Sequence, residues 1–216
     1  MSMKQKVVKF FGALLIASGL IIILGSLAFN REQNIQRQAA LDEFRQELEE
    51  VKEASLEMNV SSEDNSDSEE EASIEEADST EKPLSGKVIG ILTIPSIESE
   101  SPIREGVSQN VLADSLGHEP DTAEPGEVGN CVIAGHRNYN FNRFFSRLDK
   151  VKLGDYIQVE TLDDTYSYEV FDIKVVEPDD LSVLDNTDDE IITLYTCTPI
   201  YIGTHRLVVS AKRVEE

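Results

Sequence analysis

Short apolar runs separated by turn residues fill residues 86–216, and this pattern predicts a series of β-strands. The expected strands are Lys87–Pro95, Pro102–Arg104, Cys131–His136, Tyr156–Glu160, Tyr166–Val176, Ile191–Thr196 and the run that begins at Leu207. Short helical turns are expected at Ser108–Leu116 and Asn142–Leu148. Many short strands joined by turns favour a closed or nearly closed barrel. The predicted fold class is therefore mainly β, a barrel with short helices.

The first thirty residues follow a different pattern. Phe10–Phe29 holds no charged residue, and as a helix it would extend about 30 Å, enough to cross a bilayer. Lysines precede this run and an acidic region follows it, which by the positive-inside rule places the N-terminus in the cytoplasm and the rest outside. Residues 1–30 are therefore predicted to be a basic stub and a single transmembrane anchor. A cleaved signal peptide, with a weak cleavage site at Ser26–Ala28, is the alternative.

Two segments connect the predicted anchor to the strands. Residues 31–59 carry apolar side chains at steps of three to five and predict a helical stalk. Residues 60–85 are mostly Ser, Asp and Glu, too polar to form a core, and are expected to be a disordered acidic linker that gives the next domain reach. Residues 86–216 are long enough for one hydrophobic core and form the last predicted domain.

Charge and cysteine content exclude several classes of protein. The formal net charge is -23, so phosphate backbones would be repelled and nucleic acid is not an expected partner. The two cysteines are too few for a disulfide scaffold. They also form no C-x-x-C motif, which argues against a thioredoxin-type redox pair and a cysteine-paired zinc site.

A reactive-cysteine site is the strongest chemical signal in the chain. Cys197 ends the apolar run Ile191–Thr196, and Arg206 precedes the next run after a short loop with Pro and Gly. A thiolate is the nucleophile in thiol enzymes, and a nearby fixed positive charge favours it. Cys131 is interpreted as a small buried apolar residue, the usual environment of a free cysteine. A Cys131–Cys197 disulfide outside the cell is the alternative.

A thiol enzyme also needs a group that gives and takes protons, and histidine titrates in the useful range. His136 ends an apolar strand directly after a glycine, which would allow close approach of another backbone or a substrate. His205 precedes Arg206 and could also reach Cys197. His118 is interpreted as a structural loop residue. Local context leaves both His136 and His205 open as the base.

Arg206 and Arg137 compete for one further role. The planar donor fork of an arginine stays charged and can donate to a developing oxyanion or hold a substrate carbonyl. Arg206 heads a strand beside Cys197, although surface arginines at strand starts are common. Strand alternation predicts that Arg137 points to the face opposite His136.

These residues resemble the motifs of the sortases, the membrane-anchored cysteine transpeptidases of Gram-positive bacteria. Thr193–Cys197 matches T-L-x-T-C, and Val132–His136 matches a strand that ends in A-G-H. The resemblance covers roughly residues 86–214 and implies the sortase-type β-barrel. It also implies roles for six residues: catalytic for Cys197, His136 and Arg206, and substrate-binding for Thr196, Ala134 and His205.

The resemblance implies a two-step acyl transfer. Cys197 would attack the Thr–Gly carbonyl of an LPxTG-like sorting signal, and Arg206 would stabilise the oxyanion or position the substrate. His136 would protonate the departing amine and later deprotonate the incoming one. The expected partners are exported proteins with C-terminal sorting signals, a peptidoglycan precursor amine and the cell membrane, with the catalytic domain outside the cell.

Other interpretations stay open. The short loop between Cys197 and Arg206 resembles pilin-polymerising sortases, whereas a single N-terminal anchor favours the housekeeping or class D type. A hydrolytic cysteine protease and a surface-anchored, non-catalytic binding module are the alternatives from other classes. No cofactor or metal is assigned; calcium is an option near Glu177, Asp179 and Asp180.

Overall fold

The structure is a computed structural model that describes residues 3–60, 86–137 and 144–214. It divides into two compact units, Met1–Ala39 and Ala40–Glu216. Helix α1 (Met3–Val60) begins in the first unit and continues into the second. It covers both the segment predicted to be an anchor and the predicted stalk. Residues 61–85 of the predicted linker lie outside the described residues.

The part of α1 in the first unit presents apolar side chains to its surroundings. Leu15, Ile16 and Leu20 are exposed, as are five further residues in the next two turns, Ile21, Ile22, Ile23, Leu24 and Leu27. Within the residues that the structure describes, no helix has both the length and the apolar character that membrane crossing requires.

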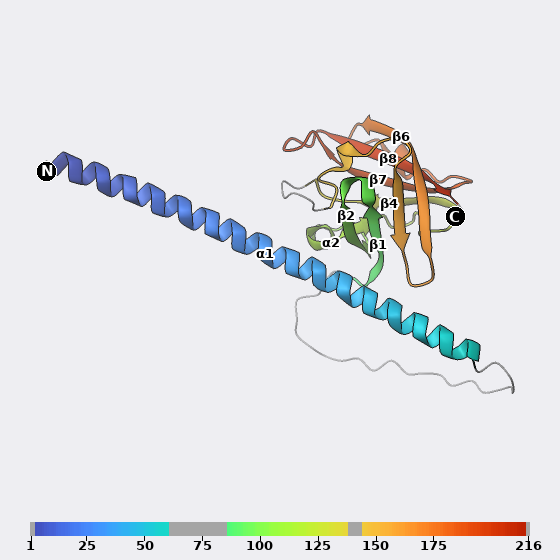
Figure 1. The fold of residues 1–216 in the computed structure, drawn as a ribbon. Coiled ribbons are helices and arrows are strands. Elements are labelled where there is room, and N and C mark those ends of the chain that lie inside the picture. Colours follow the sequence, from blue (N-terminus) through green and yellow to red (C-terminus); the bar gives the residue numbers. More distant parts are fainter. Residues whose placement is uncertain (1–2, 61–85, 138–143, 215–216) are drawn as a thin grey trace. The chain divides into compact units, whose positions relative to one another are not determined.

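Eight strands of the second unit form a closed barrel (Figure 1). They are β1 (Val88–Ile94), β2 (Ser99–Glu105), β3 (Leu116–His118), β4 (Gly129–Ala134), β5 (Tyr156–Glu160), β6 (Thr165–Val176), β7 (Glu190–Thr198) and β8 (His205–Val214). Around the barrel the order is β1-β2-β3-β4-β7-β8-β6-β5, and β5 pairs with β1 to close it. Neighbouring strands are antiparallel except β2 with β3 and β4 with β7, which are parallel.

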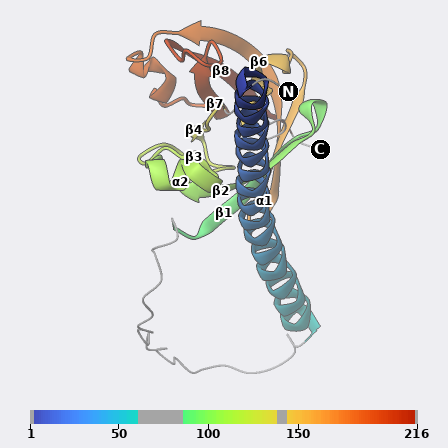
Figure 2. The same ribbon diagram turned by 90° about the vertical axis from the view of Figure 1, so that its left-hand side faces the viewer.

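Short helical segments fill some of the connections between strands. Helix α2 (Gln109–Asp114) lies beside β3 (Figure 2), and Ser108 caps it by accepting a hydrogen bond from the Val111 amide. The 3₁₀ turns are η1 (Pro95–Ile97), η2 (Leu148–Lys150) and η3 (Leu181–Leu184). Pro95 ends β1 and opens η1, because its ring prevents it from continuing a strand ladder.

The closed barrel and the strands predicted from alternating patterns are confirmed, with two differences. The helix predicted at Asn142–Leu148 is instead a turn from Phe144 that leads into η2, and residues 142–143 lie outside the described part. Strand β3 was not predicted, because three residues that include a glycine show no alternation. As a result His118, predicted to lie in a loop, lies on a strand and is buried.

The barrel encloses the main hydrophobic core. Its largest fully buried side chains include Leu92, Ile94, Ile103, Leu116, Ile133, Phe145 and Tyr168. Every residue of β4 is buried, so this strand has no solvent-exposed face. A strand buried on both faces is held firmly, and whatever follows its carboxyl end begins from a fixed position.

A second hydrophobic cluster joins α1 to the barrel within the second unit. Leu41, Phe44 and Leu48 of α1 pack against Val88 and Ile91 of β1. Three ion pairs flank this contact: Arg45–Glu100, Lys87–Glu47 and Lys52–Glu160. The helix predicted as a stalk therefore packs on the barrel for part of its length.

Candidate active site

The parallel pairing of β4 and β7 brings two predicted site residues to one end of the barrel. Ala134 is level with Tyr195, so His136 and Cys197 each lie two positions further along neighbouring chains. The Gly135 amide donates to the Tyr195 carbonyl at 3.2 Å, and the Thr196 hydroxyl donates to the Gly135 carbonyl at 2.7 Å. These two bonds extend the contact between the chains past the end of β4 and fix the two backbones relative to each other.

Gly135 is needed for packing in this arrangement. A Cβ at this position would lie 2.5 Å from Phe145 Cδ2 and 2.7 Å from Leu116 Cδ2, distances that side chains do not tolerate. The sequence suggested close approach of a backbone or a substrate. The structure shows that core side chains make the close approach.

His136 and Cys197 line one pocket of about 200 Å³. The rest of its wall comes from Arg137 and from the loop between β7 and β8, residues 199–203. Cys197 is a free thiol and half-buried. Gly203 faces it, and a Cβ at Gly203 would make an ordinary van der Waals contact with Cys197 Cβ at 3.5 Å. Tyr201 and Ile202 are exposed and give the rim of the pocket an apolar surface.

Arg206 lies beside Cys197 on the neighbouring strand. The two residues are directly paired in the antiparallel ladder of β7 and β8, which places their side chains on the same face with Cβ atoms about 5 Å apart. Arg206 Nη1 donates to the carbonyls of Gly203 at 3.3 Å and His205 at 3.2 Å. The guanidinium is thus held next to the thiol by the backbone of the loop that lines the pocket.

Arg137 also lines the pocket, contrary to the prediction from strand alternation. Its Nη1 donates to Thr198 Oγ1 at 2.8 Å, and its Nη2 lies 3.0 Å from Asp149 Oδ1. Alternation gave the wrong face because β4 ends at Ala134, so the geometry of a regular strand does not extend to residues 136–137. Burial raises the pKa of Asp149, but hydrogen bonds and charges from Lys150 and Arg137 outweigh it, so the pKa lies below its ordinary value.

The three residues predicted to bind substrate occupy different environments. Thr196 and Ala134 are 1% and 2% exposed, so both lie beneath the surface of the site. His205 is more exposed; its Nε2 lies 3.4 Å from a Glu177 carboxylate oxygen, and its Nδ1 lies 2.9 Å from Thr204 Oγ1. The Thr196 hydroxyl is thus bonded to the Gly135 carbonyl, and both ring nitrogens of His205 have neighbouring partners.

Cys131 lies in the main core and is chemically isolated from Cys197. Burial and, secondarily, the charges of Glu124, Glu105 and Glu127 raise the pKa of its thiol far above the ordinary value. It is paired with Ile192, five residues before Cys197 on β7, which corresponds to about 16 Å along a strand. A disulfide cannot span that distance, and both cysteines are free.

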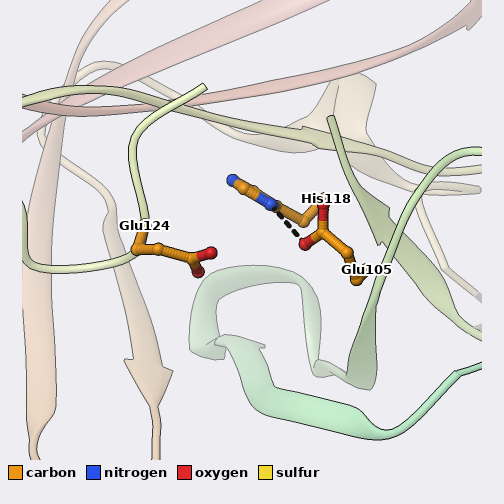
Figure 3. A group of neighbouring side chains, drawn as sticks. All are labelled: Glu105, His118 and Glu124. Atoms are coloured by element: carbon orange, nitrogen blue, oxygen red, sulfur yellow. Dashed lines mark hydrogen bonds and ion pairs between the residues drawn. The ribbon is translucent and has the colours of Figure 1, made fainter. Parts of the chain in front are cut away.

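A second cluster of polar side chains surrounds His118 (Figure 3), and the sequence offered no signal for it. Glu105 and Glu124 both point toward the His118 ring, and the three residues offer ligand atoms within 4.8 Å of one another. His118 Nδ1 lies 2.8 Å from Glu105 Oε2, and Nε2 lies 3.0 Å from the Ala123 carbonyl oxygen. Because both ring nitrogens already have partners, the structure gives His118 a role in fixing the loop after β3.

The acidic residues considered for calcium are partly used by the fold. Glu177 pairs with His205, and Asp180 Oδ1 accepts a hydrogen bond from the Ser182 amide at 3.0 Å at the start of η3. Hydrogen bonds from Ser182, first from its side chain and then from its amide, lower the pKa of Asp180.

Comparison with known proteins adds to this geometry. The family model described as Sortase domain matches residues 92–214, which includes every strand from β2 to β8. This chain belongs to the sortase family. Sortases are cysteine transpeptidases, which agrees with a free thiol, a histidine and an arginine at one end of the barrel.

Several named proteins are similar in sequence to this sortase. Sortase D of Bacillus subtilis is 36% identical over 138 residues, covering 62% of this chain and 67% of the relative. Sortase A of Listeria monocytogenes is 33% identical over 122 residues, covering 56% and 54%. This sortase thus spans about two thirds of the first relative and about half of the second.

Two solved structures share the fold over different extents. A Sortase D5 transpeptidase from Clostridium perfringens aligns with a TM-score of 0.62 and 33% identity, covering 83% of this chain and 99% of that one. Sortase C1 from Streptococcus agalactiae aligns with a TM-score of 0.57 and 39% identity, covering 60% and 68%.

Proposed function

We propose that this sortase cleaves an LPxTG-like sorting signal of exported proteins and joins the new carboxyl end to a cell-wall amine. The observation that carries the proposal is the common pocket of Cys197 and His136, with Arg206 paired to Cys197 on the next strand. This arrangement supplies a nucleophile, a proton carrier and a fixed positive charge, the three parts that covalent acyl transfer requires.

In the first step the Cys197 thiolate attacks the carbonyl carbon between Thr and Gly of the signal. The carbonyl oxygen gains negative charge, and the Arg206 guanidinium, held by the Gly203 carbonyl, donates to it. The C–N bond then breaks, the departing glycine amine takes a proton from the His136 imidazolium, and a thioester to Cys197 remains.

In the second step an amine attacks the thioester. His136, now neutral, takes the proton that the amine loses, the C–S bond breaks, and Cys197 leaves as a thiolate. A new amide replaces the old one, so the chain needs no external energy source for the exchange. Water in place of the amine would give hydrolysis.

We further propose that Phe10–Phe29 anchors the enzyme in the cell membrane with the barrel outside. Support comes from the uncharged run itself, the lysines before it and the exposed apolar side chains along this part of α1. The similarity to the Sortase D proteins supports a class D-like enzyme. The substrates are then exported proteins that meet the barrel at the outer surface.

The proposed reaction requires no cofactor, because side chains supply every group that the two steps use. Activity should therefore persist in EDTA and should not rise when calcium is added. A rise of tenfold or more with calcium would contradict this part of the proposal and would direct attention to Glu177 and its acidic neighbours.

The decisive experiment uses the full chain in detergent with a panel of LPxTG-like peptides. Intact mass spectrometry should show a peptide adduct on Cys197 that an added amine converts into ligated peptide. Cys197→Ala should form no adduct. Peptide cleavage without any response to amine would indicate a hydrolytic protease, and peptide binding that survives Cys197→Ala without any adduct would indicate a binding module.

Pilin polymerisation is the second candidate. It is favoured by the 39% identity to sortase C1 of Streptococcus agalactiae and by another similar structure, a pilus-related sortase C of Group B Streptococcus. The two candidates differ in the second step alone. Preference for the lysine side chain of a pilin over a peptidoglycan-type amine would support the second candidate.

A further inference from the structure

Arg137 connects three parts of the active site with a single side chain. It follows His136 directly in the chain, donates from Nη1 to Thr198 Oγ1 at 2.8 Å, and pairs through Nη2 with Asp149 Oδ1 at 3.0 Å. Thr198 is the residue immediately after Cys197, and Asp149 lies on η2. One guanidinium therefore links the chain at the histidine, the chain at the cysteine and the 3₁₀ turn.

The side chain is well placed to hold a fixed geometry. Arg137 exposes 8% of its side chain while it still lines the pocket with His136 and Cys197. A planar guanidinium with two donors engaged on different partners has little freedom to rotate. Lysine has a single ammonium group on a flexible stem and could not bind both Thr198 and Asp149 in this geometry.

The charge surroundings distinguish Arg137 from Arg206. Arg137 pairs with the Asp149 carboxylate, which offsets much of its positive charge. In the part of the chain that the structure describes, Arg206 has backbone carbonyl partners and no carboxylate within ion-pair distance. Arg206 therefore suits stabilisation of a developing oxyanion, whereas Arg137 suits a mechanical role.

We propose that Arg137 is a positioning residue that holds Cys197 in register with His136 by binding Thr198 and Asp149 at the same time. The proposal rests on the transpeptidase function for its kinetic consequences. Displacement of reacting groups by about 1 Å can slow an enzyme by roughly a hundredfold. Loss of either bond should therefore lower turnover more than it lowers substrate binding.

The test compares Arg137→Lys, Thr198→Val and Thr198→Ser in the full chain. Arg137→Lys and Thr198→Val should each lower kcat by about tenfold or more with KM within about twofold, and Thr198→Ser, which keeps the hydroxyl, should restore most of kcat. The double variant Arg137→Lys with Thr198→Val should be little worse than either single variant, because both changes break the same bond. Unchanged kcat in both single variants, or additive losses in the double variant, would overturn the proposal.

A matched control separates positioning from general stability. Arg213 also lies on the barrel in an ion pair, with Glu190, but is seven residues along β8 from Arg206, about 23 Å away. Arg213→Lys should leave kcat within about twofold of wild type. If melting temperature falls equally in Arg213→Lys and Arg137→Lys while kcat per folded molecule stays constant in both, Arg137 is structural and the proposal fails.

A substrate-free measurement keeps this test independent of the proposed reaction. The rate of Cys197 alkylation by iodoacetamide at fixed pH, followed by intact mass, should fall in parallel in Arg137→Lys and Thr198→Val and recover in Thr198→Ser. If wild type forms no peptide adduct, the proposed function fails while this readout still judges Arg137. Equal alkylation rates in all four proteins would overturn the positioning role.

Discussion

Cys131 and Cys197 lie on adjacent strands, yet their surroundings give the two thiols different chemistry. Cys131 is 1% exposed in the core, and burial, with a smaller contribution from the charges of three glutamates, raises the pKa of its thiol. A raised pKa keeps the thiol protonated as pH rises through neutrality, and the thiolate is the form that reacts. Cys197 is half-buried in a pocket wall, where reagents and substrates can reach it.

The folded protein should therefore react with one equivalent of a thiol reagent between about pH 7 and pH 8.5, and the unfolded protein with two. Titration with a chromogenic disulfide in buffer and in guanidinium measures both values. The variant Cys197→Ala should give close to zero in the native state. If two thiols of the folded wild-type protein react rapidly, Cys131 is not buried as the structure shows.

His136 and His205, the two histidines considered as the catalytic base, should differ sharply in their effect on turnover. His136→Ala should abolish peptide turnover, because no other residue that lines the pocket described above carries an imidazole, the group that can both give and take a proton. His205→Ala should keep most of it, since His205 pairs with Glu177. Steady-state rates with the best peptide of the panel decide this, and comparable losses in both variants would refute the assignment of the base.

The apolar pattern marks the strand ends at which Cys197, His136 and Arg206 lie, but the choice of His136 over His205 came from the resemblance to the sortases. Arg137 could not be placed correctly, since its direction depends on β4 ending at Ala134 and on a partner in η2. The surroundings of His118 were also beyond the sequence. Its contacts with Glu105 and Ala123 depend on β3, which is too short to leave a pattern.

At the scale of elements, the parallel pairing of β4 and β7 is the feature that assembles the site. Alternation of apolar residues predicts that both segments are strands, but nothing in either segment states which neighbour it pairs with or in which direction. The strands are 55 residues or more apart in the chain, with β5 and β6 between them in sequence but not in the barrel. The pattern of apolar residues alone could not predict this long-range pairing. It was implied only by the resemblance to the sortase-type barrel.

Thr196 should stabilise this pairing. Its buried hydroxyl donates to the Gly135 carbonyl at 2.7 Å, and Thr196→Val would leave that carbonyl without this partner, at a cost of about 1–3 kcal/mol in the free energy of unfolding. Urea denaturation of wild type and variant measures the difference. Thr196→Ser keeps the donor and should lose clearly less. A small loss in Thr196→Val together with a larger loss in Thr196→Ser would show that the methyl group, and not the hydroxyl, is what matters.

At the scale of the whole molecule, part of α1 packs against β1 of the barrel and forms a second hydrophobic cluster with it. The periodicity of residues 31–59 predicted a helix but could not show what its apolar face contacts. Leu41 and Phe44 are almost fully buried against β1, and the ion pairs on either side fix the register of the helix. Residues of the barrel such as Ile91 are buried partly because the helix is present.

Phe44→Ala should therefore destabilise the domain as a core substitution would, by about 3–5 kcal/mol. Val51, on the same helix but 40% exposed, provides the control, and Val51→Ala should change the free energy of unfolding by less than about 0.5 kcal/mol. Chemical denaturation of the two variants makes the comparison. A similar small effect at both positions would mean that the helix contributes nothing to the stability of the barrel.

Because α1 is bound to the barrel through Leu41, Phe44 and Leu48, the covalent connection through residues 61–85 is not what keeps the two together. A protease that cuts between Val60 and Gly86 would produce two fragments that stay associated, in the manner of a nicked protein whose halves remain bound. If Phe10–Phe29 lies in a membrane, such a cut would not release the enzyme from the cell surface. Shedding of the catalytic domain would instead require cleavage before Ala40 or separation of the helix from β1.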